Sequence, residues 1–228
     1  MKFRLRLLAL FIASAFALAG CGDGSDQDDV SNLSTSKLLA AAKKQLATQE
    51  YVSVEGKGTD KDDDTSLEID LDFAGDTASG TITVNGMEIE LLKADGQAYF
   101  KAGKEFFGPS ESAAETMDLI GDRWVLADPD DPTFGEIASF VSKKDFFAQL
   151  LDPDGKVTKV DEKSVNGVDS VGLKSTDSTF YFDKSDAKPV SLVTTDDGSG
   201  TLDFTYDKMD AAEAPPADEI VDPAKLGR

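Results

Sequence analysis

The sequence predicts an α+β fold in which one large antiparallel sheet carries helices on one face. Three observations support this prediction: apolar and acidic residues alternate in several segments, Asn-Gly and Asp-Gly pairs separate such segments, and apolar residues recur at helical spacing in the middle third. Two groups of hairpins around a helical insert imply a single sheet of about ten strands. A sheet of that size must curl or close.

The elements follow in order along the chain. A helix is predicted over residues 34–48, where apolar residues recur at helical spacing and three hydroxyl side chains can cap the start. The period then changes to two, and the predicted strands cover residues 66–73, 81–84, 87–91, 97–103, 122–128, 156–165, 168–175, 178–183, 189–195 and 200–208. Helices predicted over 110–120, 132–141 and 143–151 interrupt the strands.

The alternation also assigns the two faces of the sheet. Successive side chains of a strand point to opposite faces, so the apolar set should lie on the covered, concave side. This set comprises Leu67, Ile69, Leu71, Met87, Ile89, Leu91, Leu202, Phe204 and Tyr206. The acidic set, Glu68, Asp70, Glu88 and Glu90, should face water.

Residues 1–20 form a predicted secretory signal. Three basic residues precede an apolar run that is shorter than the about 20 residues needed to span a bilayer. The run ends in Leu18-Ala19-Gly20-Cys21, which resembles a bacterial lipobox. The resemblance implies that Cys21 receives a diacylglyceryl group and anchors the protein to the extracytoplasmic face of the cell membrane. The alternative is a secreted protein in which a cysteine lies near the cleavage site by chance.

The remaining chain divides into three parts. Residues 21–34 are predicted to be the lipidated cysteine and a disordered acidic tether, because they contain almost nothing to bury. Residues 35–208 form one domain of ordinary size. Residues 209–228 are a Pro- and Ala-rich tail along the surface, with Ile220 and Val221 docked.

The net charge limits the partners. The chain has 44 Asp and Glu against 23 Lys and Arg, a formal charge of −21, and the leader contains three of the bases and none of the acids. A surface this acidic repels nucleic acid and anionic lipid head groups. We therefore expect no nucleic-acid binding, and membrane attachment through the Cys21 acyl chains alone.

The order of the elements resembles that of a known family. A lipobox, an acidic tether, a helix, hairpins, aromatic-rich helices and further hairpins resemble the actinobacterial LppX/LprA/LprG lipoproteins, as do "ADGQAYFKAG" at 94–103 and "GDRWVLAD" at 121–128. The resemblance implies a half-barrel sheet whose concave face, closed by helices, holds acylated lipids, an architecture shared with the LolA/LolB carriers. The family has no catalytic residues to transfer.

The resemblance implies a membrane-anchored protein that binds or carries a lipid, glycolipid or other apolar ligand between sheet and helices. One or two acyl chains are expected to touch side chains of two strands and of the middle helices. These side chains are Leu71, Phe73, Ile89, Leu91, Phe134, Ile137, Phe146 and Leu150. The alternative is a core filled by the aromatic residues, in a non-catalytic envelope protein that acts through its surface.

Catalytic and metal chemistry find little support in the sequence. The chain contains no His, which removes Ser-His-Asp and Cys-His arrangements and most zinc sites. The acidic clusters at 60–64 and 128–131 are interpreted as solvated loops, since a calcium loop starting at Asp60 would need Gly and Glu in place of Thr65 and Leu71. We expect no enzymatic activity, no cofactor, no metal and a monomeric state.

Overall fold

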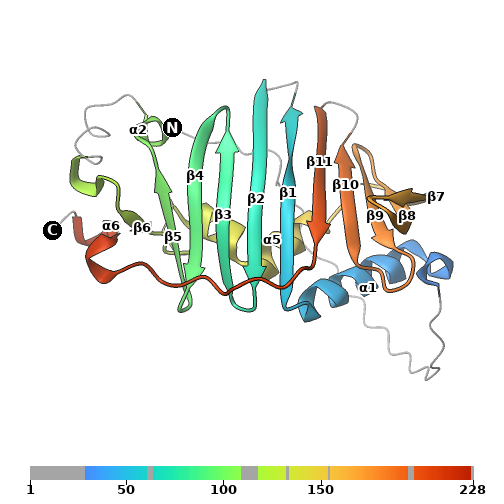
Figure 1. Cartoon of the computed structure of the whole chain (residues 1–228). Helices are drawn as coiled ribbons and strands as arrows, with labels where there is room; N and C mark the ends of the chain where they lie inside the picture. The colour runs from blue at the N-terminus through green and yellow to red at the C-terminus, as the bar shows by residue number, and fades with distance from the viewer. Residues whose placement is uncertain are drawn as a thin grey trace.

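One twelve-stranded sheet dominates the computed structural model, which describes residues 29–60, 64–108, 118–131, 134–153, 155–194 and 198–226. The strand order is β12-β6-β5-β4-β3-β2-β1-β11-β10-β9-β8-β7, and every pairing is antiparallel except that of β12 with β6 (Figure 1). The strands are β1 (Tyr51–Asp60), β2 (Thr65–Ala74), β3 (Thr77–Val84), β4 (Met87–Ala94), β5 (Gln97–Ala102), β6 (Trp124–Leu126), β7 (Thr158–Val165), β8 (Val168–Lys174), β9 (Ser178–Asp183), β10 (Pro189–Thr194), β11 (Gly198–Thr205) and β12 (Ile220–Val221). The predicted fold class is confirmed.

The helices of the described chain are α1 (Thr35–Thr48), α2 (Lys104–Phe107), α4 (Gly135–Val141), α5 (Lys143–Leu150) and α6 (Pro223–Leu226), with the short 3-10 helices η2 (Val30–Asn32) and η3 (Ala217–Glu219). The helices predicted over 34–48, 132–141 and 143–151 occur in the predicted order, as α1, α4 and α5, whereas α2 and α6 were not predicted. Ser34 caps α1, its hydroxyl accepting a hydrogen bond from the Lys37 N–H at 3.4 Å. The helix predicted over 110–120 lies outside the described residues except for 118–120, which are helical.

Three of the predicted turns join strands as expected. Asn85, Asp95 and Asn166 have φ angles of 52°, 52° and 50°, and each is followed by a glycine whose φ is also positive. Positive φ at both central residues is typical of type I′ turns, whose twist matches that of a hairpin. The predicted turn at 197–198 falls partly outside the described residues.

The two faces of the sheet differ strongly. On the inner face, which α4 and α5 cover, Leu71 and Phe73 are 0% exposed, whereas Glu68 and Asp70 on the outer face are exposed. A β-strand produces this separation because its side chains alternate with period two. Nearly all of the predicted covered set lies in the core or packs against it; Met87 is half-buried and lies outside the core cluster.

Strand β1 was missed in the sequence, and its glycines explain why. Val52 and Val54 occupy inner-face positions and are fully buried, but Gly56 and Gly58 occupy the next two inner positions. A Cβ atom on Gly56 would lie only 1.9 Å from the backbone oxygen of Thr201 in β11. The close approach of the two strands therefore favours glycine, and the glycines interrupt the apolar alternation.

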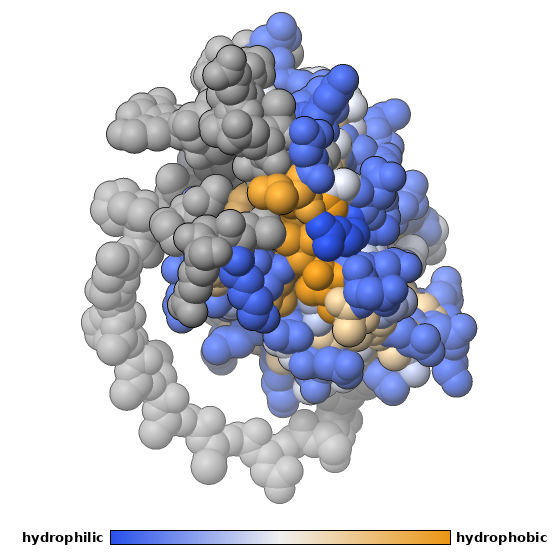
Figure 2. All heavy atoms as spheres, turned by 90° about the vertical axis from the view of Figure 1, so that its left-hand side faces the viewer, coloured by the Kyte–Doolittle hydropathy of each residue, from blue (hydrophilic) through white to orange (hydrophobic). Residues whose placement is uncertain are grey.

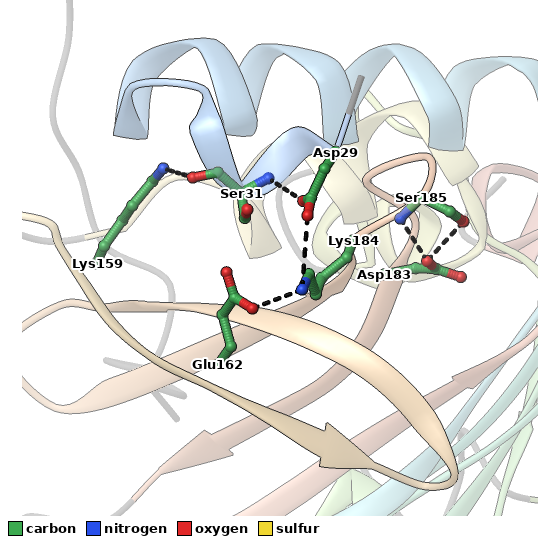
Figure 3. Close-up of polar contacts among 7 residues, drawn as sticks. All are labelled: Asp29, Ser31, Lys159, Glu162, Asp183, Lys184 and Ser185. Carbon is green, nitrogen blue, oxygen red and sulfur yellow. Dashed lines mark hydrogen bonds and ion pairs between the residues drawn. The ribbon is translucent and has the colours of Figure 1, made fainter. Parts of the chain in front are cut away.

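The N-terminal boundary of the domain lies earlier than predicted. Residues 29–34, assigned to a disordered tether, are part of the fold: Val30 is buried, and its N–H donates to the carbonyl of Lys184 at 2.9 Å. The Lys184 ammonium lies 3.5 Å from the Asp29 carboxylate and 2.5 Å from that of Glu162 (Figure 3). The apolar residues Val30 and Leu33 and this charge network fasten the segment to the core, to β7 and to Lys184 after β9.

The C-terminal tail also belongs to the sheet. Its chain crosses in front of the lower ends of β2 to β5 before forming β12 (Figure 1). The Ala212 N–H donates to the Thr77 hydroxyl at 3.0 Å, and Ile220 and Val221 pair with Trp124 and Val125 of β6. The tail predicted from residue 209 thus adds an edge strand, and the sheet has twelve strands where about ten were predicted.

Candidate ligand-binding site

All eight residues predicted to touch a ligand meet in one apolar layer between the inner face and the helices. Six of them belong to the buried core and two, Phe134 and Leu150, are half-buried against it. Strands β2 and β4 contribute one side of this layer, whereas α4, α5 and the residue before α4 contribute the other. The six buried residues are Leu71, Phe73, Ile89, Leu91, Ile137 and Phe146. Their role in ligand binding stays a prediction.

Aromatic rings fill the described part of the layer. The Phe73 ring lies 5.5 Å from that of Phe146 and 5.3 Å from that of Phe147, centroid to centroid. Phe147 in turn lies 6.4 Å from Phe204, and Phe204 lies 5.7 Å from Phe180. These distances are those of rings in contact, so side chains occupy the space where a ligand was expected.

A second aromatic group extends the layer toward the β6 edge. The Phe100 ring lies 5.1 Å from that of Phe134 and 5.6 Å from that of Phe106. Phe106 and Phe107 of α2 are half-buried, and Leu119 nearby in sequence is 52% exposed. Figure 2 shows apolar side chains gathered on this face, with hydrophilic ones to their right and below. The apolar layer thus reaches the molecular surface at this edge.

The described layer contains no buried polar side chain. The buried polar residues of the described chain are Ser170 and Ser191, and both occupy outer-face positions in the strand register. Ser170 donates to the Val168 carbonyl at 2.9 Å, and no described buried side-chain N or O atom lacks a partner. The layer can therefore exclude water and hold apolar groups, but it offers no acid, base or nucleophile.

Two grooves open beside the helices. The larger, of about 620 Å³, lies between α1, α5 and the β2–β3 turn, and the smaller, of about 430 Å³, lies between α4 and the β4–β5 hairpin. Neither is lined by any of the eight predicted residues. Four lysines line the larger groove: Lys43, Lys93, Lys143 and Lys144. Sequence reasoning missed this group because its members come from three distant segments.

Lys143 also contacts the end of α1. Its ammonium donates to the carbonyl of Gln49, the residue that ends α1. Burial lowers the pKa of Lys143, and the nearby Asp76 carboxylate opposes that shift. The side chain therefore ties the start of α5 to the end of α1 while its charge stays at the edge of the groove.

Metal binding and membrane spanning find no support in the described part of the chain. No group of three or more Cys, Asp or Glu side chains there could hold a metal ion. Asp128 instead accepts a hydrogen bond from the Asp130 N–H at 2.9 Å, as in a loop. Among the same residues, no helix is long and apolar enough to cross a bilayer. Cys21, the predicted lipidation site, lies outside the described residues.

Comparison with known proteins finds similarity in fold. No family model and no curated protein matches the chain. The lipoprotein LppX of Mycobacterium tuberculosis has a TM-score of 0.48 at 16% identity, over 78% of this chain and 100% of that chain. LprF of Mycobacterium bovis has a TM-score of 0.48 at 13% identity, over 78% of this chain and 95% of that chain.

A putative outer membrane lipoprotein-sorting protein domain from Vibrio parahaemolyticus is a more distant match. It has a TM-score of 0.29 at 11% identity, over 75% of this chain and 92% of that chain. The structural neighbours thus include LppX itself, from the family that the sequence resembles. At these identities the similarity concerns the fold alone.

Proposed function

We propose that the protein is a membrane-anchored, extracytoplasmic lipoprotein that binds or carries a lipid, without catalysing a reaction. One observation carries the proposal: the described layer between the inner face and α4 and α5 contains no buried Ser, Thr, amide or charged side chain, and the hydroxyl of the half-buried Tyr206 at its margin donates to the Pro189 carbonyl. An acyl chain that enters it breaks no side-chain hydrogen bond. It replaces contacts among rings with contacts to methylene groups, and burial contributes about 25 cal/mol per Å² of apolar surface.

The helices over the layer are short enough to move. α4 has 7 residues and α5 has 8, and Ser142 both ends α4 and caps α5. Loops with Asp128-Pro129 and Asp152-Pro153 adjoin the pair, and such loops can act as hinges. An outward movement of α4 and α5 would separate Phe146 from Phe73 and open the space that the rings fill.

The anchor would hold the domain close to its lipid source. Cys21 follows a lipobox-like sequence, and two acyl chains give stable membrane attachment. The described chain starts at Asp29, and the residues between Cys21 and Asp29 can span at most about 28 Å. The domain therefore stays within reach of the membrane during lipid exchange.

Native mass spectrometry of the full chain, extracted from its membrane in mild detergent, tests the proposal. We expect a diacylglyceryl mass at the N-terminal cysteine and additional non-covalent lipid. Cys21→Ser should lose the covalent mass. Leu91→Trp on the inner face should reduce the non-covalent lipid several-fold because the ring overfills the layer, whereas Glu90→Trp on the outer face should retain it. Wild-type protein without bound lipid would contradict the binding proposal.

The second candidate is an envelope lipoprotein that acts through its surface. The ring contacts of Phe73 with Phe146 and Phe147 favour it, because they leave the layer filled. The same measurement separates the two candidates. A wild-type chain that carries the covalent anchor but neither co-purifies with lipid nor takes up an added acyl probe would support the surface role.

A further inference from the structure

The larger groove combines positive charge with an apolar floor. We call it the lysine groove and define it by its lysines and its four large apolar residues. These are Lys43, Lys93, Lys143 and Lys144, with Leu46, Val141, Phe147 and Leu151. Lys43 and Lys144 are exposed, and Lys93 and Lys143 are half-buried. The four apolar side chains are almost fully buried and therefore form the bottom of the groove.

The charge of the groove opposes that of the chain. The protein carries a formal charge of −21, yet Asp76 is the one acidic residue among the residues that line this groove. None of the four lysines forms an ion pair with the described acidic residues. Four ammonium groups against the single carboxylate of Asp76 leave a net positive charge around the groove, which favours an anion.

The floor of the groove connects it to the apolar layer. Phe147 lines the groove, and its ring contacts Phe73 at 5.3 Å, Phe146 at 5.2 Å and Phe204 at 6.4 Å. Phe147 thus belongs both to the floor of the groove and to the ring contacts of the layer proposed for an acyl chain. Rotation of this ring, or a small shift of α5, would make the two spaces continuous.

We propose that the lysine groove holds the anionic head group of a lipid whose acyl chain enters the layer beside Phe147. This inference rests on the proposed function and adds the class of head group. The volume of about 620 Å³ suits a compact head group and the first part of a chain. The lysines at the rim suit an anionic head group, and the apolar side chains at the floor suit the acyl chain attached to it.

The position of the groove agrees with a membrane source. The β2–β3 turn and the end of α1, which both line it, lie at the same edge of the sheet as η2 and the start of the described chain (Figure 1). Asp29, at that start, is at most about 28 Å of chain from the proposed anchor. The groove and the start of the described chain therefore lie at the same edge of the sheet, at opposite ends of α1.

Two lysolipids with equal acyl chains provide the test. Lysophosphatidylglycerol is anionic and lysophosphatidylcholine has no net charge. The difference between their affinities for the full chain, measured by native mass spectrometry, therefore gives the contribution of head-group charge to binding. We expect wild-type protein to bind the anionic probe about tenfold more tightly. The triple variant Lys43→Gln, Lys93→Gln, Lys144→Gln should lose this preference but still bind both probes. Lys143 is left intact because it contacts Gln49.

A matched triple variant controls for net charge. Lys57→Gln, Lys174→Gln, Lys208→Gln removes three exposed lysines outside the groove and should keep the wild-type preference. An unchanged preference in the groove variant would overturn the inference and leave the proposed function standing, whereas a wild-type chain that binds neither probe would overturn both. Inorganic phosphate at millimolar concentration should not displace the anionic probe; full displacement would identify a free-anion site instead.

Discussion

The inner and outer faces of the sheet share one backbone but have opposite chemistry. Along β2, Leu71 is fully buried on the inner face, and Asp70 beside it is exposed to water. The same contrast holds along β4 between Leu91 and Glu90. The inner face supplies burial energy and a dry space, and the outer face supplies charge and solubility. Because side chains alternate with period two, the ten residues of β2 supply both the buried apolar face and the charged, solvent-exposed face.

The outer face becomes apolar where another segment covers it. Leu92 and Tyr99 are a cross-strand pair on the outer face, and they are 8% and 2% exposed. The C-terminal tail crosses the same ends of the strands, with Ala212 bonded to Thr77. Acidic residues therefore occupy the outer face where water meets it, and apolar residues occupy it where the tail does.

The largest expected effect separates the two faces directly. Ile69 is 5% exposed on the inner face, so Ile69→Asp buries a charge without a partner and should lower the free energy of unfolding by about 4 kcal/mol. Glu68→Lys on the outer face should change it by less than about 1 kcal/mol, mainly because the new side chain lies opposite Lys57. Urea-induced unfolding of both variants provides the measurement.

Equal destabilisation by the two variants would contradict the assignment of the faces. A matched neutral substitution, Ile69→Val, keeps the position apolar and should cost only about 1 kcal/mol. It therefore distinguishes the cost of buried charge from the cost of lost volume.

The faces could be predicted from the sequence because their signal is local. A strand such as β2 alternates without interruption, and α1 places Leu38, Ala42 and Leu46 at helical spacing after the cap at Ser34. Each pattern indicates the secondary structure and the buried face of its own segment. The sheet, the order of its hairpins and the apolar layer follow from such segments taken one after another.

The features that could not be predicted depend on contacts between distant segments. β12 has two residues, Ile220 and Val221, which is too short for a period to show. The lysine groove brings together α1, β4 and α5, and composition alone indicated a surface that repels anions. Net charge is a sum over the whole chain, so it does not report where the few lysines gather.

The second-largest effect is expected from a substitution on the inner face of β1, where glycines occupy positions that are apolar in the other strands. Gly56→Ala places a Cβ atom 1.9 Å from the Thr201 oxygen and 2.8 Å from the Leu202 Cα, so β1 and β11 must separate. We expect a loss of about 2 kcal/mol in unfolding free energy. Gly58→Ala is the matched control, because its Cβ atom would lie 3.3 Å from the Gly200 Cα, and it should cost less than about 1 kcal/mol.

The two alanine variants also report on why β1 contains glycine. If both cost the same, close approach to β11 is not the reason, and the loss of strand flexibility would have to explain both. Hydrogen exchange of the β1 and β11 amides locates the change: Gly56→Ala should weaken protection along this pair and leave the β4–β5 pair unchanged.

The smallest expected effect concerns a contact held by charge on the surface rather than by burial. The Ser31 side chain and N–H are the main cause that lowers the pKa of Asp29, and Lys184 lowers that of Glu162. Because the carboxyl pKa values of Asp29 and Glu162 are lowered in the folded protein, their contacts stabilise it fully above the ordinary carboxyl pKa, which is near 4. This stabilisation is lost as the pH falls through the lowered pKa values. The amides of Val30 and Ser31 should therefore lose protection below about pH 4.

Hydrogen exchange, corrected for the intrinsic dependence of the rate on pH, measures this loss of protection. The change should be at most a few-fold, because exposed ion pairs contribute little. Lys184→Met should reproduce the loss at the Val30 amide already at pH 7, since it removes the shared partner of Asp29 and Glu162. The Ser31 amide should stay protected in this variant, because Asp29 remains ionised and accepts from it. Lys188→Met removes the pair with Asp186 and the contact with the Tyr206 ring, neither of which involves Asp29 or Glu162, and should leave these amides unchanged. Protection of Val30 that stays constant from pH 7 to 3 would mean that burial of its side chain, and not the charge network, holds this segment on the domain.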